Sequence, residues 1–338
     1  MTRSATAIAH PNIALAKYWG KRAGEGNVPA VPSLSVTLAG MSTTTTVSFD
    51  DTLVDDEVVL NGAHAEGSRP KVRASQLLDR VRIAAHTTTR ARIVSTNDFP
   101  TASGLASSAS GFAALALASV RAAGLDWTAE QVADLARRSS ASAARSVFGG
   151  FVELDGGMAE DGTPSTGAAR AVAGPSALDL CVLVCVTTEA PKATSSTDGM
   201  RLTQEISPYY AAWVADAPSS QRAIRTALLA GDFVRVGELA ERSALAMHAC
   251  AMAAGVVYVS GATLAALAQV HALRAAGLPV FATIDAGPHL KCLVRSADAR
   301  AARESLEGVP GVLRIIETTP GEGARIVDTS AKDEGAAP

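Results

Sequence analysis

The sequence predicts an α+β fold, because strand and helix signals alternate without the regular repeat of a doubly wound sheet. Short apolar and β-branched segments predict strands at 43–49, 58–60, 92–96, 178–186, 280–285, 291–294 and 312–317. Longer segments rich in Ala and Leu predict helices at 108–123, 221–230, 233–253 and 262–276. With 338 residues and 48% apolar composition, the chain can form two domains with buried cores.

The ends of the helices carry their own signals. Gly124 follows the first helix, and Thr128 with Gln131 has the spacing of a capping box that starts another helix. Glycines at 231, 255 and 277 stand at the ends of the later helices. We place a domain boundary after the strand at 178–186, which gives domains at 1–187 and 188–329, and we expect 330–338 to form a disordered tail.

Charge and hydropathy exclude several classes of protein. A net charge of −3 gives no basic excess for binding nucleic acid. The longest apolar run, 180–186, is far shorter than the roughly 20 residues of a membrane-spanning helix, and residues 1–9 lack the apolar stretch of a signal peptide. We therefore expect a cytoplasmic protein with no nucleic-acid or membrane partner. Its four cysteines, without close pairs, should be buried and reduced.

Residues 100–111, Pro-Thr-Ala-Ser-Gly-Leu-Ala-Ser-Ser-Ala-Ser-Gly, join a predicted strand to a predicted helix. Their small side chains let the backbone approach a ligand, and the free N–H groups of a helix's first turn favour an anion. Ser107 and Ser108 add hydroxyls that can bind phosphate or magnesium. The composition of this segment alone is equally consistent with a helix start that packs tightly against a sheet and binds no phosphate. The chain has neither a Walker loop nor a Gly-x-Gly-x-x-Gly fingerprint.

A basic cluster lies near the N-terminus. Lys17, Lys21 and Arg22 fall within six residues, beside Tyr18 and Trp19. Such a cluster can hold a phosphate or diphosphate through charge-assisted hydrogen bonds. In isolation, a solvated basic turn anchored by the indole would be the alternative.

These two segments resemble a known family. Residues 100–111 are similar to the phosphate loop of the GHMP kinases, and residues 10–22 to the Asn-Ile-Ala-x-x-Lys-Tyr-Trp-Gly-Lys segment of the mevalonate diphosphate decarboxylases. Residues 136–151, 192–203 and 283–289 resemble further segments of that family in the same order. The resemblance thus extends over most of the chain.

The resemblance implies a two-domain GHMP-kinase-like fold, with an N-terminal α/β domain containing a left-handed βαβ unit and a C-terminal ferredoxin-like α+β domain. It implies a homodimer that uses ATP and Mg²⁺ to phosphorylate the 3-hydroxyl of mevalonate diphosphate and then releases CO2, phosphate and isopentenyl diphosphate. A phosphomevalonate decarboxylase, which would use the monophosphate, a mevalonate 3-kinase and a non-catalytic nucleotide-binding relative remain alternatives.

The resemblance also implies roles for individual residues. Asp285 would orient or deprotonate the hydroxyl, and Arg145 would hold the carboxylate. Lys17, counted with these two as catalytic, would hold the distal phosphate together with Tyr18 and Lys21. Ser107 would bind magnesium. The other implied substrate-binding residues are Tyr18, Lys21, Ser140, Ala141, Ser142, Ser196 and Thr197. The implied ATP-binding residues are Asn97, Ser103, Gly104, Leu105, Ala106, Ser107, Ser108 and Lys192.

Some positions depart from the family's pattern. Ser139 and Ala141 stand where the family usually has glycine, and Thr197 stands where some bacterial members have an arginine that contacts phosphate. His289 replaces an asparagine. These differences leave open whether the substrate is the diphosphate or the monophosphate. We expect His248 to be structural.

Overall fold

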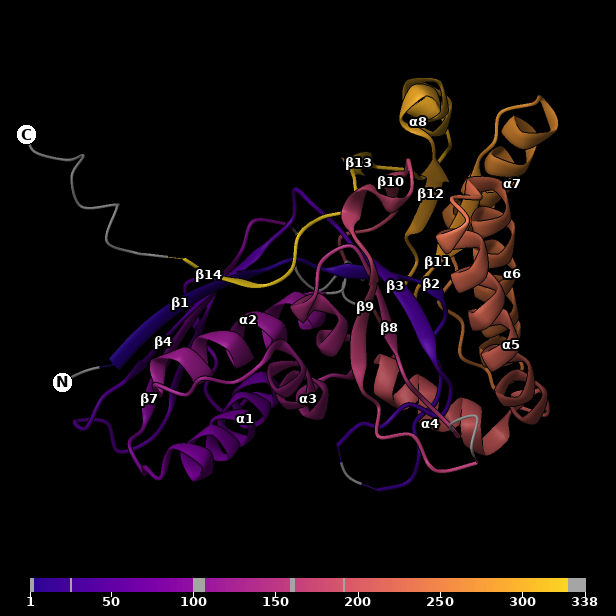
Figure 1. Cartoon of the computed structure of the whole chain (residues 1–338). Coiled ribbons are helices and arrows are strands. Elements are labelled where there is room, and N and C mark those ends of the chain that lie inside the picture. Colours follow the sequence, from indigo (N-terminus) through magenta and orange to yellow (C-terminus); the bar gives the residue numbers. More distant parts are fainter. Residues whose placement is uncertain (1–2, 25, 100–106, 159–161, 191, 328–338) are drawn as a thin grey trace, which may run out of the picture.

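The computed structural model describes residues 3–24, 26–99, 107–158, 162–190 and 192–327. Figure 1 shows two lobes side by side, one built mainly from the first third of the chain and the other from the last half. The predicted tail at 330–338 lies outside the described residues. The α+β architecture predicted from the sequence is confirmed by the arrangement of sheets and helices in the two lobes.

The first lobe contains a six-stranded sheet in the order β14, β1, β4, β7, β5, β6. In that order the strands span Arg325–Val327, Arg3–Ala9, Thr43–Phe49, Ala91–Asn97, Glu57–Leu60 and Ala63–His64. Because β14 pairs with β1, the end of the described chain returns to the N-terminal sheet. The strands predicted at 43–49, 58–60 and 92–96 are confirmed.

Helices α1 (Arg69–Ala85) and α2 (Ser107–Ala122) pack against this sheet, and α3 (Ala129–Ser139) packs against both of them. Helix α2 is the central one, and its many buried alanines let it lie close to β1 and β4. The predicted capping box of Thr128 and Gln131 starts α3. Strands β5 and β7 are parallel neighbours joined through α1, as in a βαβ unit, whose left-handed sense stays a prediction.

A four-stranded antiparallel sheet connects the two lobes. Its strands, in spatial order, are β2 (Asn12–Ala16), β3 (Ser33–Thr37), β8 (Phe151–Leu154) and β9 (Ala169–Ala173). Every residue of β2 and β3 is buried, because helices of both lobes cover this sheet. The short 3-10 helix η1 (Ala141–Val147) precedes β8. Both β2 and η1 carry residues of the candidate site.

The third sheet lies in the second lobe in the antiparallel order β11, β12, β10, β13. In chain order its strands are β10 (Cys181–Val186), β11 (Phe281–Ile284), β12 (Leu290–Val294) and β13 (Arg314–Thr318). The helices between β10 and β11 are α4 (Ser196–Ile206), α5 (Tyr210–Leu229), α6 (Phe233–Met252) and α7 (Gly261–Ala275). Helix α8 (Ala299–Glu307) joins β12 to β13, which gives the βαββαβ order of a ferredoxin-like unit. The division at 187 and 188 stays a prediction, although β10 pairs with β12 and β13, which follow it.

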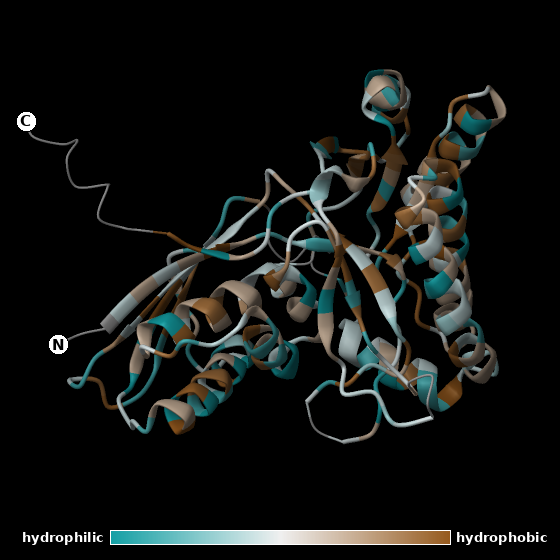
Figure 2. Ribbon diagram, viewed as in Figure 1, coloured by the Kyte–Doolittle hydropathy of each residue, from teal (hydrophilic) through white to brown (hydrophobic). Residues whose placement is uncertain are grey.

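Some elements differ from the sequence-based expectation. Helix α5 begins eleven residues before the predicted start at 221 and contains Pro218. Strand β10 begins at Cys181 rather than at 178, because a short 3-10 turn occupies 175–177. Helix α1 was not predicted, since its buried residues are few and the rest of the helix is strongly charged, an alternation that Figure 2 shows.

Two further expectations can be compared with the structure. All four cysteines are free and buried, as predicted. Among the residues that the structure describes, no helix is both long enough and apolar enough to cross a membrane.

A glycine in α6 sets how closely this helix approaches the third sheet. A Cβ atom built at Gly237 would overlap the ring of Phe281 on β11, the strand that leads to Asp285. We predict that Gly237→Ala lowers the free energy of unfolding by about 1–3 kcal/mol, because the ring must shift in a packed core. Gly111→Ala on α2, where a Cβ meets nothing, should instead gain about 0.5–1 kcal/mol. Denaturant unfolding measures both, and a more stable Gly237→Ala variant would contradict the close packing.

Candidate active site

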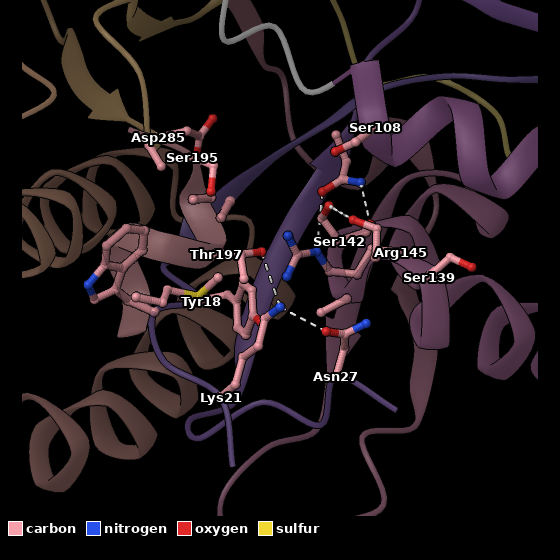
Figure 3. A pocket seen from close by; sticks show the side chains of 18 of the residues that line it. Tyr18, Lys21, Asn27, Ser108, Ser139, Ser142, Arg145, Ser195, Thr197 and Asp285 are labelled. Atoms are coloured by element: carbon pink, nitrogen blue, oxygen red, sulfur yellow. Dashed lines mark hydrogen bonds between the residues drawn. The ribbon is translucent and has the colours of Figure 1, made fainter. Parts of the chain in front are cut away.

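A cavity of about 520 Å³ lies between the lobes and collects most of the predicted site residues. Figure 3 shows Asp285 and Ser195 on one side of it and Arg145, Ser142 and Ser108 on the other. The predicted residues that line the cavity are Lys17, Tyr18, Lys21, Ser108, Ser140, Ala141, Ser142, Arg145, Lys192, Ser196, Thr197 and Asp285.

Two other predicted residues, Asn97 and Ser107, are described by the structure but do not line this cavity. Asn97 ends β7, where its side-chain oxygen accepts a hydrogen bond of 2.5 Å from the Thr43 hydroxyl. Ser107 is the first residue of α2, next to Ser108. Ser103, Gly104, Leu105 and Ala106 lie outside the described residues. The ATP and magnesium roles of these residues stay predictions.

A buried ion pair forms the centre of the site. The Lys17 ammonium lies 2.7 Å from Oδ1 of Asp285, and the side chain of Lys17 is 2% exposed. A second ammonium, from Lys291 on β12, lies 3.2 Å from Oδ2 of the same carboxylate. Each carboxylate oxygen of Asp285 therefore has its own cation.

A β-bulge in β2 places Lys17. The pairing of β2 with β3 shifts between Ala14 and Ala16, so that one residue is extra on β2. The Ala14 carbonyl then accepts hydrogen bonds from the Lys17 ammonium at 2.8 Å and from the Thr283 hydroxyl at 3.2 Å. Because Thr283 belongs to β11, this carbonyl ties the strand before Lys17 to the strand before Asp285.

Burial and charge together set the protonation states. Burial opposes ionisation of Asp285, but the ammonium groups of Lys17 and Lys291 outweigh it and hold the pKa of this carboxyl well below its usual range. Burial lowers the pKa of Lys17 to about 8, although the Asp285 carboxylate acts in the opposite direction. Burial likewise lowers the pKa of Arg145 to about 10. At neutral pH, Asp285 is an ionised hydrogen-bond acceptor and a weak base.

Arg145 is fixed in place before any ligand arrives. Its Nε donates to the Asn12 side-chain oxygen at 3.2 Å, and its Nη1 donates to the Ser33 hydroxyl at 2.6 Å. The amide nitrogen of Asn12 donates in turn to the Ser146 hydroxyl at 2.7 Å. Arg145 is 3% exposed and lines the cavity. A planar guanidinium held in this way suits recognition of a carboxylate.

Lys21 stands at another end of the cavity. Its ammonium donates to the Asn27 side-chain oxygen at 2.8 Å and to the Thr197 hydroxyl at 3.3 Å, as the dashed lines in Figure 3 show. The pKa of Lys21 is lowered by burial and by the nearby Arg73. Arg69 and Arg138 also line this end. The concentration of cations here favours a phosphate or diphosphate.

Lys192 and the start of α4 close the cavity near Asp285. The ammonium of Lys192 donates to the Ser196 hydroxyl at 2.8 Å and to the Ala286 carbonyl at 3.1 Å. Ser195 caps α4 by accepting a hydrogen bond of 3.1 Å from the Asp198 amide. Lys192 thus links the loop that carries Asp285 to the N-terminus of a helix.

Several residues of the site were not predicted. Lys291 lies in a buried strand, where the sequence pattern indicates only core packing. Arg69, Arg73 and Gln76 come from α1, a helix that the apolar pattern did not reveal. Asn12 stands at the start of the family motif at 10–22, but nothing in that motif indicates that it holds Arg145. The expectation that His248 is structural agrees with its burial and its contact of 3.3 Å to the Ile284 carbonyl.

The fold and the cavity together define an enzyme whose cationic cleft accepts a small anionic substrate. The chain belongs to the diphosphomevalonate decarboxylase family: the diphosphomevalonate decarboxylase-like N-terminal domain matches residues 9–167, and the mevalonate 5-diphosphate decarboxylase C-terminal domain matches residues 182–326. The predicted family is thereby confirmed.

Individual relatives support this assignment. Diphosphomevalonate decarboxylase mvd1 of Aspergillus fumigatus is 34% identical over 328 residues, which cover 91% of this chain and 80% of the relative. The phosphomevalonate decarboxylase of Haloferax volcanii is 38% identical over 286 residues, 84% of this chain and 86% of the relative. Relatives of both substrate types thus match most of the chain.

Solved structures agree with the fold. The mevalonate diphosphate decarboxylase of Staphylococcus aureus matches with a TM-score of 0.90 and 35% identity, over 97% of this chain and 99% of that one. The Enterococcus faecalis enzyme matches with a TM-score of 0.86 and 36% identity, over 97% and 100% of the two chains. A related structure, MDDEF in complex with MVAPP, AMPPCP and magnesium, has a TM-score of 0.87 and 36% identity, with the same coverage.

The buried position of Lys17 predicts a pH dependence. With its pKa lowered to about 8, the ammonium loses its charge as the pH rises through that value, and Asp285 loses a partner. We predict that kcat/KM of the enzyme falls above about pH 8 and that Lys17→Met, which has low activity throughout, lacks this alkaline limb. A pH–rate profile tests this, and an identical limb in Lys17→Met would assign it to another group.

Proposed function

We propose that this chain catalyses the ATP-dependent decarboxylation of mevalonate 5-diphosphate to isopentenyl diphosphate, with release of ADP, phosphate and CO2. The observation that carries the proposal is the convergence of Asp285, Lys17, Arg145 and Ser108 on one cavity. Family membership supports the same reaction.

Each end of the cavity suits one part of the substrate. Lys21 and Tyr18 hold the terminal phosphate, with the hydroxyls of Ser196 and Thr197 beside them. Arg145 holds the carboxylate through its planar fork. Ser140 and Ser142, whose hydroxyl oxygens lie 3.2 Å apart, complete the polar wall around it, and Ala141 lies between them. The 3-hydroxyl of a substrate held at both ends then faces Asp285.

The reaction proceeds in two steps. Transfer of the terminal phosphoryl group of ATP to the 3-hydroxyl releases ADP and one proton. The C3–O bond to the new phosphate then breaks, and phosphate leaves with its electrons. The C–C bond between the carboxylate carbon and C2 also breaks, and its electrons form the C2–C3 double bond as CO2 leaves. Asp285 accepts a hydrogen bond from the hydroxyl and so aligns it with the nucleotide. Arg145 keeps the carboxylate bond aligned while positive charge develops at C3.

The nucleotide fits at the start of α2, where Ser108 lines the cavity and the helix N-terminus favours phosphate. Lys192 lines the same cavity from the opposite lobe. Among the described residues, no group of three or more His, Cys, Asp or Glu side chains could hold a metal. That suits Mg²⁺ bound mainly by ATP phosphates, with the hydroxyl of Ser107 as a protein ligand. Bound magnesium supplies charge neutralisation for the phosphoryl group.

The monophosphate is the second candidate substrate. Thr197 provides a neutral hydroxyl where some relatives have an arginine, and the Haloferax volcanii relative is a phosphomevalonate decarboxylase. That reaction would give isopentenyl phosphate. The cations Arg69 and Arg138 at the same end of the cavity favour the diphosphate.

We further propose that the protein is cytoplasmic and acts as a homodimer. Its family membership and its buried, free cysteines support these proposals. Size-exclusion chromatography with light scattering measures the dimer directly, and a monomer at assay concentration would refute it.

A substrate panel tests the proposed reaction. Purified protein is incubated with ATP, magnesium and each of mevalonate, its monophosphate and its diphosphate, while CO2 and ADP are measured. We predict equal amounts of CO2 and ADP, with the highest kcat/KM for the diphosphate. ADP without CO2 would identify a 3-kinase, a preference for the monophosphate would identify the second candidate, and no turnover would identify a non-catalytic relative.

The role of Asp285 is tested by removing its carboxylate. We predict that Asp285→Ala lowers kcat by at least about 10³-fold, since the hydroxyl loses its acceptor and Lys17 and Lys291 lose their counter-ion. Nucleotide affinity should remain within about threefold, a shift of well under 1 kcal/mol, because Asp285 faces the hydroxy acid. Steady-state kinetics and equilibrium binding of an ATP analogue measure the two effects, and near-native turnover would remove Asp285 from the mechanism.

Arg145 can be tested with its charge kept. In Arg145→Lys a point charge replaces the two-pronged contact, so we predict a loss of at least about 10²-fold in kcat/KM. Nε and Nη1 would no longer hold Asn12 and Ser33. Steady-state kinetics measure the loss, and a rate close to that of the unsubstituted enzyme would count against a carboxylate contact.

A further inference from the structure

Lys291 is a buried lysine behind the cavity. It lies on β12 opposite Thr283 of β11, is 1% exposed, and does not belong to the cavity lining. Its ammonium is 3.2 Å from Oδ2 of Asp285. Among the described residues, neither this Nζ nor Oδ2 of Asp285 has a partner with hydrogen-bond geometry, so the two atoms form an ion pair without a regular hydrogen bond. Asp285 is thus the group that balances this charge.

A lysine at this position needs an explanation. Taking an ammonium out of water is costly, and a buried strand is normally filled by apolar side chains, as at its neighbours Leu290 and Leu293. An apolar residue of similar length would fill the same space. The contact with Asp285 is therefore the one that a lysine can make at this position and an apolar residue of similar length cannot.

Several other charged or titratable groups face Asp285. Lys17 approaches from the end of β2, Arg145 from η1, Lys192 from the segment before α4, and His248 from α6. Burial lowers the pKa of His248 to about 4, so this imidazole is neutral near pH 7. Lys17, Arg145 and Lys192 all line the cavity, where an anionic substrate and nucleotide share their charge.

Lys291 differs from these cations because it is 1% exposed and does not line the cavity. We infer that Lys291 is a positioning residue for the reaction: it holds Oδ2 of Asp285 from the protein side while Lys17 holds Oδ1. The carboxylate is thereby kept ionised and fixed in orientation, with its remaining lone pairs available to the substrate hydroxyl. This inference rests on the proposed function. The positive charge of Lys291 would act on Asp285 whether or not a ligand occupies the cavity.

The inference is tested by Lys291→Met, which keeps the length of the side chain and removes its charge. Without this cation, burial raises the pKa of Asp285, and activity that needs the carboxylate is lost as the pH falls through the new value. We expect the acid limb of kcat/KM to move up by at least about one pH unit, which corresponds to a tenfold loss on that limb. We also expect kcat to fall by more than tenfold at neutral pH, with KM for ATP nearly unchanged.

Lys71→Met is the matched control. Lys71, on α1, forms ion pairs with the exposed carboxylates of Asp55, in the loop before β5, and Glu66, in the loop before α1, and it does not line the cavity. This variant should keep the activity and pH profile of the unsubstituted enzyme. A folded Lys291→Met with an unmoved acid limb, or with a loss that is equal at every pH, would overturn the inference.

A second measurement does not depend on the variant folding. The carboxyl ¹³C resonance of Asp285, assigned by comparison with Asp285→Asn, can be titrated in the unsubstituted protein. We expect it to stay that of a carboxylate down to about pH 4, the ordinary value for Asp, and a titration at or above that value would overturn the inference. If the unsubstituted enzyme releases no CO2, the proposed function fails instead. The same titration repeated in Lys291→Met separates the effect of Lys291 from that of Lys17, and an unchanged titration would overturn the inference.

Discussion

The site depends on the ion pair between Lys17 and Asp285, because this contact joins segments that are 268 residues apart and fixes both charges in a buried place. Removing Asp285 would leave two buried ammonium groups without their carboxylate, and removing Lys17 would leave Oδ1 of Asp285 without its cation. Either loss is unfavourable in the interior. The two backbone elements are also held together by the Ala14 carbonyl, which accepts from Lys17 and from Thr283. The local geometry of a bulged strand thus determines where the carboxylate can lie.

The rest of the fold supplies what this pair lacks. The connecting sheet and η1 hold Arg145 across the cavity through Asn12 and Ser33, which are rigid, buried partners. The first lobe provides the start of α2, and the second provides α4 and the loop of Asp285 (Figure 3). Each lobe contributes binding residues to one side of the cavity. A substrate held from both sides therefore has its reactive carbon between the lobes. This division explains why the site lies between the lobes rather than within one of them.

The sequence predicted much of this arrangement, and for identifiable reasons. Strands with β-branched or apolar patterns, such as 43–49 and 312–317, lie close to their expected places, and the capping box at Thr128 starts a helix. Motif residues Lys17, Arg145 and Asp285 meet in one cavity as the resemblance implied. The contributions of α1 and of Lys291 could not be foreseen, because charged helices and a buried lysine have no local signal for what they will contact. Those contacts depend on tertiary packing, not on the neighbouring sequence.

The central claim is that Asp285 and Arg145 bind the same substrate molecule, Asp285 at its 3-hydroxyl and Arg145 at its carboxylate. A crystal structure of this protein with mevalonate diphosphate and a non-hydrolysable ATP analogue tests it most directly. The account predicts the 3-hydroxyl within hydrogen-bond distance of Asp285, the carboxylate against Arg145, and the nucleotide phosphates at the start of α2. A substrate whose carboxylate lies away from Arg145, or whose hydroxyl points away from Asp285, would contradict it.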